Sequence, residues 1–406
     1  MRLTGSYDLI VVGGGLGGSS LAKAMAESGA RVLLLEREHQ FKDRVRGEAM
    51  WPWGFAELQA LGIDSSVYSS FATEKPYLDL YFGGKQIDRR DVASTSNQRL
   101  PLLNWIHYEM EEGLLRAAER AGAEVRRATR ACEVRPAAAA TGGAMPAVVF
   151  EHNGRTEEVE ARLIVCADGR GSVARKWAGF DVHHDPRGTL FAGVLLEGSE
   201  LQNNSWFMDP EAGQFAFVSP QTDSRVRAYA WYPNNRDYRL QGAGDFNRFV
   251  AESAKAGVPS EWFTNLRLIG PLATFDATDS WVNHPYKNGV ALLGDSAATT
   301  DPSHGQGQSL TLRDARVLRD QLLASNDWDA AAHAYADEHD RYFTALHKFY
   351  GWFWEILYDP SPAGTAHRTR VLPRLIEDLT RMPDSLVSGP EVPLDDTARC
   401  RFFAED

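Results

Sequence analysis

Apolar runs, helical periodicity and a glycine-rich turn follow one another at the start of the chain. Residues 7–12 (YDLIVV) are apolar and rich in β-branched side chains, which predicts a parallel strand buried on both faces. Residues 19–28 have helical character and end at Gly29. Residues 31–35 then predict a second strand, which ends at Glu36. This order of elements predicts one βαβ unit.

The pattern further along the chain changes twice. The hydrophobic spacing predicts helices at 52–61, 102–121, 245–256 and 308–323, and strands at 76–82, 85–87, 148–150, 157–159, 161–167, 275–282 and 290–293. Residues 189–233 predict strands rich in Phe, Trp and Tyr without helices between them, which indicates an inserted antiparallel sheet. The chain beyond 323 is predicted to be helical to about residue 379, and residues 137–143 are predicted to be a hairpin tip.

The turn after the first strand has the spacing of a dinucleotide-binding loop. Gly13, Gly15 and Gly18 fill the GxGxxG pattern: one for a tight turn, one for close approach to a pyrophosphate, one for helix packing. The following helix directs free N–H groups and its positive dipole end at the phosphates. Glu36 suits a carboxylate that accepts hydrogen bonds from ribose hydroxyls. This placement fits NAD or FAD and argues against NADP at this site.

Length and composition restrict the function classes. At 406 residues the chain exceeds the usual size of one core, which predicts two interleaved domains. A net charge of −12 gives no general attraction to nucleic acid or to anionic membrane, and no run of ~18 apolar residues predicts membrane insertion. Cys132, Cys166 and Cys400 lack a metal-ligand spacing, so no metal site is expected. With a strand starting almost at the N-terminus, we expect a cytoplasmic protein.

Two further motifs follow predicted parallel strands. Residues 167–169 (ADG) follow one strand, with Ser172 and Arg175 in the spacing DGxxSxxR. Residues 294–296 (GDS) end another strand, and residues 302–307 (PSHGQG) precede the predicted helix at 308–323. Since ligands gather at the carboxyl ends of parallel strands, the three motifs are expected to converge.

With these three motifs, the chain resembles the group A FAD-dependent aromatic hydroxylases, a family of flavoprotein monooxygenases, up to about residue 323. The resemblance implies an α/β fold in which a Rossmann-type FAD-binding domain with a parallel sheet is interrupted by an antiparallel-sheet substrate domain, with a helical C-terminal layer. The implied division assigns 1–75, 100–180 and 283–325 to the FAD-binding domain, 76–99 and 181–282 to the substrate-binding domain, and 326–406 to the C-terminal helical region.

The resemblance also implies a reaction. NADH or NADPH would reduce FAD, O2 would add to the flavin, and the C4a-hydroperoxide would transfer one oxygen to a small, electron-rich and commonly aromatic molecule. The chain lacks a second GxGxxG motif for the nicotinamide nucleotide, which fits this family. A monomer or a homodimer is expected.

The residues expected to bind FAD come from all three motifs and from the connection after Glu36. Arg46 is placed to neutralise a pyrophosphate, and Asp295 to accept a hydrogen bond from a ribitol hydroxyl. By resemblance, His107 stands where an arginine or glutamine touches the ribityl chain. The full set is Gly13, Gly15, Leu16, Gly17, Gly18, Glu36, Arg37, Arg46, Gly47, His107, Asp168, Gly169, Gly294, Asp295, Pro302, Gly305, Gln306 and Gly307.

The substrate is expected between the flavin and the aromatic strands. Trp206, Phe215, Phe217, Tyr229 and Trp231 are the candidate wall, although strand alternation directs only about half of such residues inward. The catalytic residue is unknown from the sequence. The candidates are His304, Lys75 and Tyr229, and further polar residues considered are His284 and Arg227.

A second resemblance keeps other reactions open. Residues 47–52 (GEAMWP) fit the GExxxP stretch of flavin-dependent halogenases and of geranylgeranyl-reductase-like proteins. Lys75 would then be the lysine that a halogenase needs, and residues 215–220 (FAFVSP) a degenerate WxWxIP segment. The alternatives are therefore a halogenase, a two-component oxygenase fed by a separate flavin reductase, or an FAD-dependent reductase.

Overall fold

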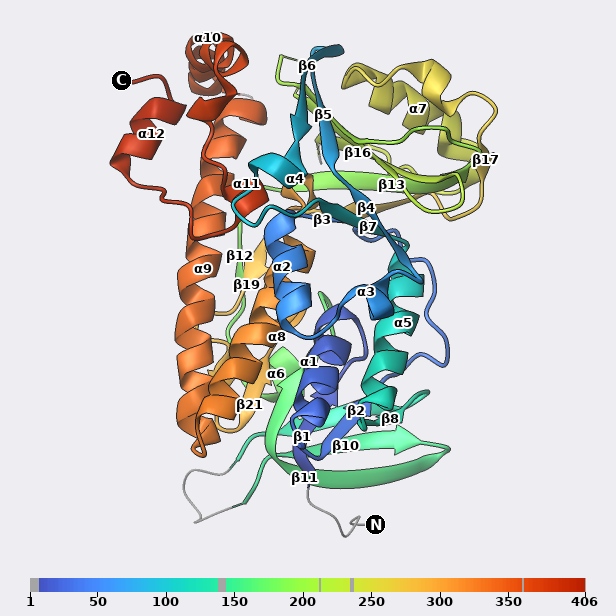
Figure 1. The fold of residues 1–406 in the computed structure, drawn as a ribbon, viewed down its shortest axis with the longest axis vertical. Helices are drawn as coiled ribbons and strands as arrows, with labels where there is room; N and C mark the ends of the chain where they lie inside the picture. Colours follow the sequence, from blue (N-terminus) through green and yellow to red (C-terminus); the bar gives the residue numbers. More distant parts are fainter. Residues whose placement is uncertain (1–6, 138–143, 212, 234–236, 360, 406) are drawn as a thin grey trace.

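The computed structural model describes residues 7–137, 144–211, 213–233, 237–359 and 361–405. Two eight-stranded sheets lie toward opposite ends of the molecule, and the long helix α9 (Trp328–Leu357) runs beside both (Figure 1). The architecture is mixed α/β, with a parallel sheet, a second, mostly antiparallel sheet and a helical C-terminal region. This fold class is the one that the sequence predicts.

The first sheet is built around parallel strands that are buried on both faces. In spatial order it contains β20 (Tyr286–Lys287), β21 (Val290–Leu292), β11 (Arg155–Cys166), β1 (Tyr7–Val12), β2 (Val32–Leu35) and β8 (Glu124–Arg126), with β10 (Ala147–His152) and β9 (Arg130–Arg135) added antiparallel beside β11. Leu9 and Val11 belong to the core that also contains buried residues of α1 (Leu16–Glu27), α5 (His107–Arg120) and α8 (Gly307–Ala324). Ile10 and Val12 face a second core shared with β9 and β10.

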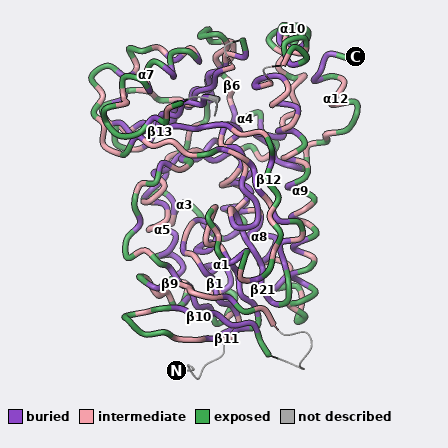
Figure 2. The backbone as a smooth tube through the Cα atoms, turned by 180° about the vertical axis from the view of Figure 1, so that it is seen from behind, coloured by how far each residue is buried: buried purple, intermediate pink, exposed green. Residues whose placement is uncertain are grey.

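The second sheet has two faces with different neighbours. Its order is β17 (Arg267–Leu268), β13 (Thr189–Glu197), β16 (Arg225–Pro233), β15 (Gln214–Pro220), β14 (Asn204–Asp209), β5 (Tyr77–Phe82) and β6 (Lys85–Asp91), with β18 (Ala273–Asp276) also beside β13. All pairs are antiparallel except β14 with β5. Phe191, Phe215 and Tyr229 share the large core with α1 and α8, whereas Ala216 and Tyr232 lie in a separate core with residues of α7 (Phe246–Lys255). Strand β13 is buried along nearly all of its length (Figure 2).

The remaining elements are two small sheets, further helices and short turns. Two small sheets contain β3 (Ala49–Met50), β7 (Leu102–Trp105) and β4 (Ala72–Lys75), and β12 (His183–His184), β19 (Ser280–Trp281) and β22 (Ala298–Thr299). The remaining helices are α2 (Pro52–Ala60), α3 (Ser65–Tyr68), α4 (Val92–Thr95), α6 (Ala174–Trp177), α10 (Pro362–Glu377), α11 (Ser385–Ser388) and α12 (Asp396–Phe402), with short 3-10 turns η1 (Ala243–Asp245), η2 (Ser260–Phe263), η3 (Gly294–Ser296), η4 (Pro302–His304) and η5 (Leu379–Arg381).

Three predicted elements differ from the structure. The predicted helix at 102–121 begins as strand β7, because residues 102–105 pair with β3 and β4 before α5 starts. The predicted strands at 157–159 and 161–167 are one strand, β11. The predicted strand at 275–282 is divided into β18 and β19, since the carboxylate of Asp276 accepts a 2.9 Å hydrogen bond from the N–H of Thr278 and turns the chain.

The helical prediction for the C-terminal part is confirmed with a break between α9 and α10. The aromatic residues of α9 mostly face the core rather than solvent. Residues 138–143 of the predicted hairpin tip lie outside the described part of the chain. Within that part, no helix combines the length and apolarity needed to cross a membrane.

The domain division drawn from the sequence stays a proposal, and the strand pairings can be compared with it. The strands of 76–99 join the second sheet together with most strands of 181–282. The exceptions are β12 and β19, which pair with each other, and β19 also pairs with β22 from the segment 283–325. The small sheet of β12, β19 and β22 therefore contains strands from both proposed domains.

Candidate functional site

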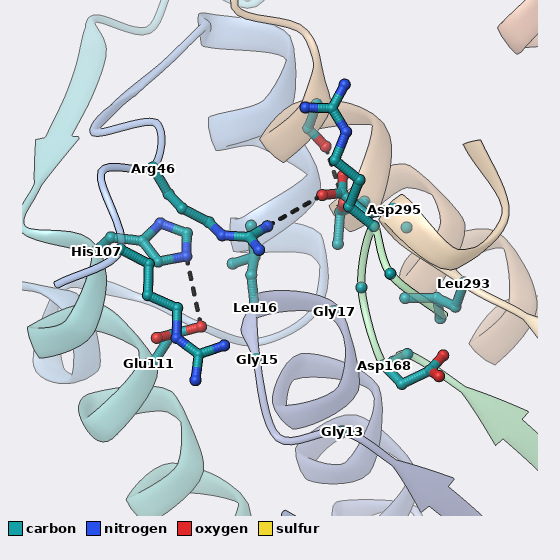
Figure 3. Close-up of a pocket in the computed structure, with 18 of the residues that line it drawn as sticks. Gly13, Gly15, Leu16, Gly17, Arg46, His107, Glu111, Asp168, Leu293 and Asp295 are labelled. Atoms are coloured by element: carbon teal, nitrogen blue, oxygen red, sulfur yellow. Dashed lines mark hydrogen bonds and ion pairs between the residues drawn. The ribbon is translucent and has the colours of Figure 1, made fainter. Parts of the chain in front are cut away.

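A large cavity of about 630 Å³ opens where the parallel strands end. Val12, Leu35, Ala167 and Leu293, which end or directly follow β1, β2, β11 and β21, all line it. Figure 3 shows side chains that reach into this cavity from separate segments of the chain. Its volume is in the range of ~300–1,000 Å³ that small-molecule sites occupy.

The glycines of the first motif are required by close contacts. Gly13 has φ +105°, and a Cβ there would lie 2.3 Å from the carbonyl oxygen of Ala167. A Cβ on Gly17 would lie 2.3 Å from Leu293, and one on Gly18 only 2.0 Å from the carbonyl oxygen of Gly13. Gly13 and Gly17 line the cavity, whereas Gly18 does not line it and instead lets α1 pack against β1.

Glu36 closes this first motif from the end of β2. Its Oε2 accepts a 2.7 Å hydrogen bond from the N–H of Gly14, and its Oε1 accepts one of 2.7 Å from the N–H of Glu38. Burial raises the pKa of Glu36, while the backbone hydrogen bonds oppose that shift. A carboxylate oxygen can accept more than one hydrogen bond. Both oxygens of Glu36 can therefore also accept hydrogen bonds from the hydroxyl groups of a ligand in the cavity.

Arg175 joins the second and third motifs. Its Nε donates a 2.6 Å hydrogen bond to the carbonyl oxygen of Ser296, and its Nη2 donates to that of Asp295. Asp168 accepts a 3.1 Å bond from the N–H of Val173 through Oδ2. Its other oxygen, Oδ1, is buried at the cavity without a hydrogen-bond partner among the described residues. This oxygen is therefore an acceptor available to a ligand.

The buried carboxylate of Asp314 holds the third motif, residues 294–296, in place. Asp314 of α8 accepts a 2.8 Å hydrogen bond from the N–H of Gly294. It also accepts from Nδ1 of His339 at 2.9 Å and from the hydroxyl of Tyr342, both on α9. The loop that carries Asp295 is thus held by the C-terminal helices.

The side chains of Arg46 and His107 enter the cavity opposite this loop. Nη1 of Arg46 lies 3.3 Å from Oδ2 of Asp295 (Figure 3). The residue predicted to bind the pyrophosphate thus forms an ion pair with the residue predicted to bind the ribitol. Nδ1 of His107 lies 3.1 Å from the carbonyl oxygen of Gly47, and its Nε2 lies 3.4 Å from Glu111. Burial lowers the pKa of His107, but Glu111 and Glu48 together outweigh it and the net shift is upward.

Nearly all of the predicted cofactor residues line this cavity. The residues that do are Gly13, Gly15, Leu16, Gly17, Glu36, Arg37, Arg46, Gly47, His107, Asp168, Gly169, Gly294, Asp295, Pro302, Gly305 and Gly307. Gln306 does not, because its side chain turns away: Oε1 accepts from Nε1 of Trp53 at 3.0 Å, and Nε2 donates to the carbonyl oxygen of His304 at 2.7 Å. Its side chain therefore braces the loop, and Gly305 and Gly307 form the lining.

A smaller, aromatic pocket of about 70 Å³ adjoins the large cavity. Trp206, Phe215, Phe217 and Tyr229 line it, as do Phe191, Trp51 and Leu102. Trp231 does not line it, because its ring stacks on Tyr358 with 4.4 Å between ring centroids. The residues that line both spaces are Gly47, Ala49, Phe275, Pro302 and Gly305.

Glu48 and Tyr229 are two of the polar side chains in the aromatic pocket. The Tyr229 hydroxyl lies within hydrogen-bond distance of Oε2 of Glu48 and of the carbonyl oxygen of Arg46. Oε1 of Glu48 lies 3.0 Å from Nη2 of Arg227, which also donates to Asp43 at 2.8 Å. Burial raises the pKa of Glu48 to about 7, although Arg227 and Tyr229 oppose the shift.

The other predicted catalytic candidates occupy different positions. His304 lines the aromatic pocket, its Nδ1 lies 3.0 Å from Oγ of Ser303, and burial lowers its pKa to about 3, so the imidazole is neutral. Lys75 lies in β4, paired with Leu102, and lines neither cavity. His284 also lines neither and pairs with Asp337 at 3.1 Å.

Sequence reasoning assigned no role in the site to Glu48 or Asp314. Glu48 lies inside the GExxxP motif, so a signal for it existed. Asp314 had no signal, because an aspartate within a helix is ordinarily a solvated residue. Within the described ranges, no group of three His, Cys, Asp or Glu side chains is arranged to hold a metal ion.

Comparison with known proteins identifies similar chains. The model of a family described as an FAD-binding domain matches residues 6–345. A digeranylgeranylglycerophospholipid reductase of Methanosarcina acetivorans is 25% identical over 321 residues, which cover 74% of this chain and 71% of the relative. A 6-methylpretetramide 4-monooxygenase of Streptomyces rimosus is 28% identical over 323 residues, covering 76% and 73%.

A solved structure has a similar fold over nearly the whole chain. The p-nitrophenol 4-monooxygenase of Pseudomonas putida superposes with a TM-score of 0.77 and 18% identity. The superposition covers 94% of this chain and 97% of that one.

Proposed function

The chain belongs to the FAD-binding domain family, and from that premise we propose an FAD-dependent monooxygenase that uses NADH or NADPH and O2 to oxygenate an aromatic or other electron-rich small molecule. Membership makes the protein an FAD-dependent oxidoreductase. The oxygenation, the reductant and the substrate class are the parts that we propose.

The observation that carries the proposal is the junction of the two spaces. The large cavity and the aromatic pocket share the segment around Gly47 and the loop that contains Pro302 and Gly305. A compound in the pocket would therefore contact whatever part of the cofactor reaches this junction. Such adjacency is what direct transfer of an atom between cofactor and substrate requires.

The lining of the large cavity fits FAD. Glu36 suits the adenosine ribose, and the N-terminus of α1 with its close-packed glycines suits the pyrophosphate. The unpartnered Oδ1 of Asp168 and the carboxylate of Asp295 are acceptors for the polar groups of a ribityl chain or ring. When bound, FAD supplies electron transfer from NAD(P)H and the activation of O2.

The protein's own contribution is a dry, oriented pocket. The rings of Phe191, Trp206, Phe215 and Phe217 exclude water and favour a flat apolar ring. The edge of the neutral His304 imidazole and the Glu48–Tyr229 pair provide the few polar contacts that orient a ligand. This composition supports a small aromatic substrate with one or two polar substituents.

A reductase is the second candidate function, supported by the similarity to the archaeal reductase. Halogenation has less support, because Lys75 lines neither cavity. A single experiment separates the three. Flavin bleaching and reoxidation are followed after the FAD-loaded protein is mixed with NADH or NADPH, alone, with a panel of phenols, or with an alkene.

Fast bleaching that a phenol accelerates, followed by O2-dependent reoxidation and an oxygenated product, supports the monooxygenase. Bleaching that occurs only with an added flavin reductase supports a halogenase or a two-component oxygenase. Reoxidation by an alkene, without consumption of O2, supports the reductase.

A further inference from the structure

The carboxyl group of Glu48 lies at the junction of the aromatic pocket and the large cavity. It follows Gly47 and precedes Ala49, which both line the two spaces, and Glu48 itself lines the pocket. Only 1% of the residue is exposed to solvent. A carboxyl group buried among aromatic rings needs a structural or chemical reason, because charged groups are rarely buried without full pairing.

The charges around Glu48 do not pair it fully. Arg227 is a single buried cation whose Nη2 contacts both Asp43, at 2.8 Å, and Glu48, at 3.0 Å. Two carboxylates therefore share one guanidinium. Because the single charge of Arg227 cannot balance two carboxylates, Glu48 can exist either as the acid or as the anion.

The side chain of Tyr229 can form a hydrogen bond with both the ionised and the protonated form of Glu48, because only its hydroxyl proton has to rotate. Its hydroxyl has one proton and two neighbours within hydrogen-bond distance, Glu48 and the carbonyl oxygen of Arg46. When Glu48 is ionised, the hydroxyl donates to its carboxylate. When Glu48 is protonated, the carboxyl donates to the tyrosine oxygen and the hydroxyl turns to Arg46. Loss or gain of a proton thus leaves a hydrogen bond between Glu48 and Tyr229 in both states.

We propose that Glu48 is the catalytic base of this site, and that the substrate is a phenol or an enol whose hydroxyl group meets Glu48 in the aromatic pocket. In this step the carboxylate forms an O–H bond as the substrate O–H bond breaks. The electron pair of the broken bond stays on the substrate oxygen, and nothing is oxidised or reduced. The resulting phenolate or enolate is more electron-rich at its ring or carbon chain, as transfer of an electrophilic oxygen demands.

The surroundings of Glu48 favour it over the other candidates. The charged or titratable groups that face it are Asp43 from the preceding loop, Arg227 and Tyr229 from β16, and His107 from α5. Their balance with burial leaves a pKa of about 7, which suits a base at neutral pH. Tyr229 has a pKa raised well above its ordinary value, and His304 has one of about 3, so neither suits that role.

This inference rests on the proposed function, and p-nitrophenol is the probe that tests it. The phenolate form of this compound absorbs visible light at wavelengths where its neutral form does not. Difference spectra of the FAD-loaded protein are recorded with the probe across pH for wild type, Glu48→Gln, Tyr229→Phe and Tyr232→Phe. Tyr232 lies on the same strand and its hydroxyl bonds Thr274 on the far face, so its variant is the matched control.

We expect wild type and Tyr232→Phe to bind the probe as phenolate once Glu48 ionises. In Glu48→Gln the bound probe should stay neutral, with oxidation of phenols slowed ~10²–10⁴-fold, as for loss of a general base. In Tyr229→Phe the phenolate should form only at higher pH, because the tyrosine hydrogen bond favours the ionised carboxylate. Glutamine and phenylalanine have nearly the shapes of glutamate and tyrosine, so both variants should retain the shape of the pocket.

Different results overturn the role of Glu48, the substrate class and the proposed function. Equal phenolate bands in wild type and Glu48→Gln, or neutral probe bound in both, overturn the role of Glu48. Failure of p-nitrophenol and of every other phenol in a panel to perturb the flavin spectrum overturns the substrate class. A wild-type flavin that neither NADH nor NADPH reduces contradicts the proposed function itself.

A readout that needs neither cofactor nor substrate is the infrared band of a protonated carboxylic acid. Asp301, whose pKa burial raises to about 6, contributes to this band in both proteins, so the readout is the pH-difference spectrum of wild type minus that of Glu48→Gln. A band that titrates near neutral pH should remain after this subtraction, and its absence overturns the proposal even if Glu48→Gln binds flavin poorly.

Discussion

Replacement of Glu48 by glutamine should remove a pH-dependent loss of stability. Glutamine has nearly the shape of the protonated acid, and its amide can donate to Tyr229 as the carboxyl does. In the wild-type protein, burial raises the pKa of Glu48 from 4.5 to about 7. The folded state therefore keeps the proton at pH values where the unfolded chain has already lost it.

The size and sign of the effect follow from this difference. One pKa unit corresponds to ~1.4 kcal/mol, so the shift amounts to roughly 3 kcal/mol in the free energy of unfolding. Because the folded-state pKa is the higher one, this stability is fully present below pH 4.5 and is lost as pH rises through about 7. Between about pH 5 and about pH 8, Glu48→Gln should gain roughly 2–3 kcal/mol relative to wild type.

Urea unfolding at a series of pH values measures this difference directly. The other titrating groups are common to both proteins, so subtraction isolates Glu48. Tyr232→Phe, which removes a hydroxyl and no carboxyl group, should differ from wild type by a constant amount at all these pH values. A difference between Glu48→Gln and wild type that is equally constant would refute the reasoning, because it would mean that Arg227 keeps Glu48 ionised throughout.

Three further predictions concern the motifs that form the large cavity. Asp295→Ala should yield purified protein with less flavin and roughly tenfold weaker FAD binding, since an acceptor at the cavity is lost. Gly18→Ala should lower the free energy of unfolding by about 1–3 kcal/mol, since the new Cβ would lie 2.0 Å from the carbonyl oxygen of Gly13. Asp314→Ala should cost about 3–5 kcal/mol and flavin content, since the N–H of Gly294 and two other donors lose their acceptor.

Each of these predictions has a result that contradicts it. Flavin occupancy in Asp295→Ala equal to that of wild type would place the ribityl chain elsewhere. An unchanged unfolding midpoint in Gly18→Ala would show that α1 is free to move away from β1. Full flavin content and stability in Asp314→Ala would show that the GDS loop needs no support from α8 and α9.

Local sequence predicted the frame of the site well. The strand before Gly13, the helix after it and the acid at Glu36 are adjacent in the chain, so their geometry follows from backbone rules alone. The motifs at Asp168 and Asp295 each follow a buried parallel strand, and such strands bring their carboxyl ends together. For these residues, knowledge of the elements was sufficient to predict a common cavity.

The remaining details depend on side-chain direction and on contacts between distant segments. Trp231 and Phe215 are direct cross-strand neighbours, yet only Phe215 lines the pocket because Tyr358, which directly follows α9, covers the tryptophan. Gln306 turns toward Trp53, 253 positions away in the chain. The environment of Glu48 is assembled from a loop, strand β16 and helix α5, and no local pattern encodes that meeting.

Isotopically labelled O2 gives the most direct test of the central claim that this flavoprotein is a monooxygenase. The FAD-loaded protein is supplied with NADH or NADPH and a phenol that accelerates flavin bleaching, and the product is analysed by mass spectrometry. Our account predicts that one labelled oxygen atom enters the organic product for each NAD(P)H consumed. A product whose new oxygen comes from water, or consumption of NAD(P)H that does not depend on O2, would contradict it.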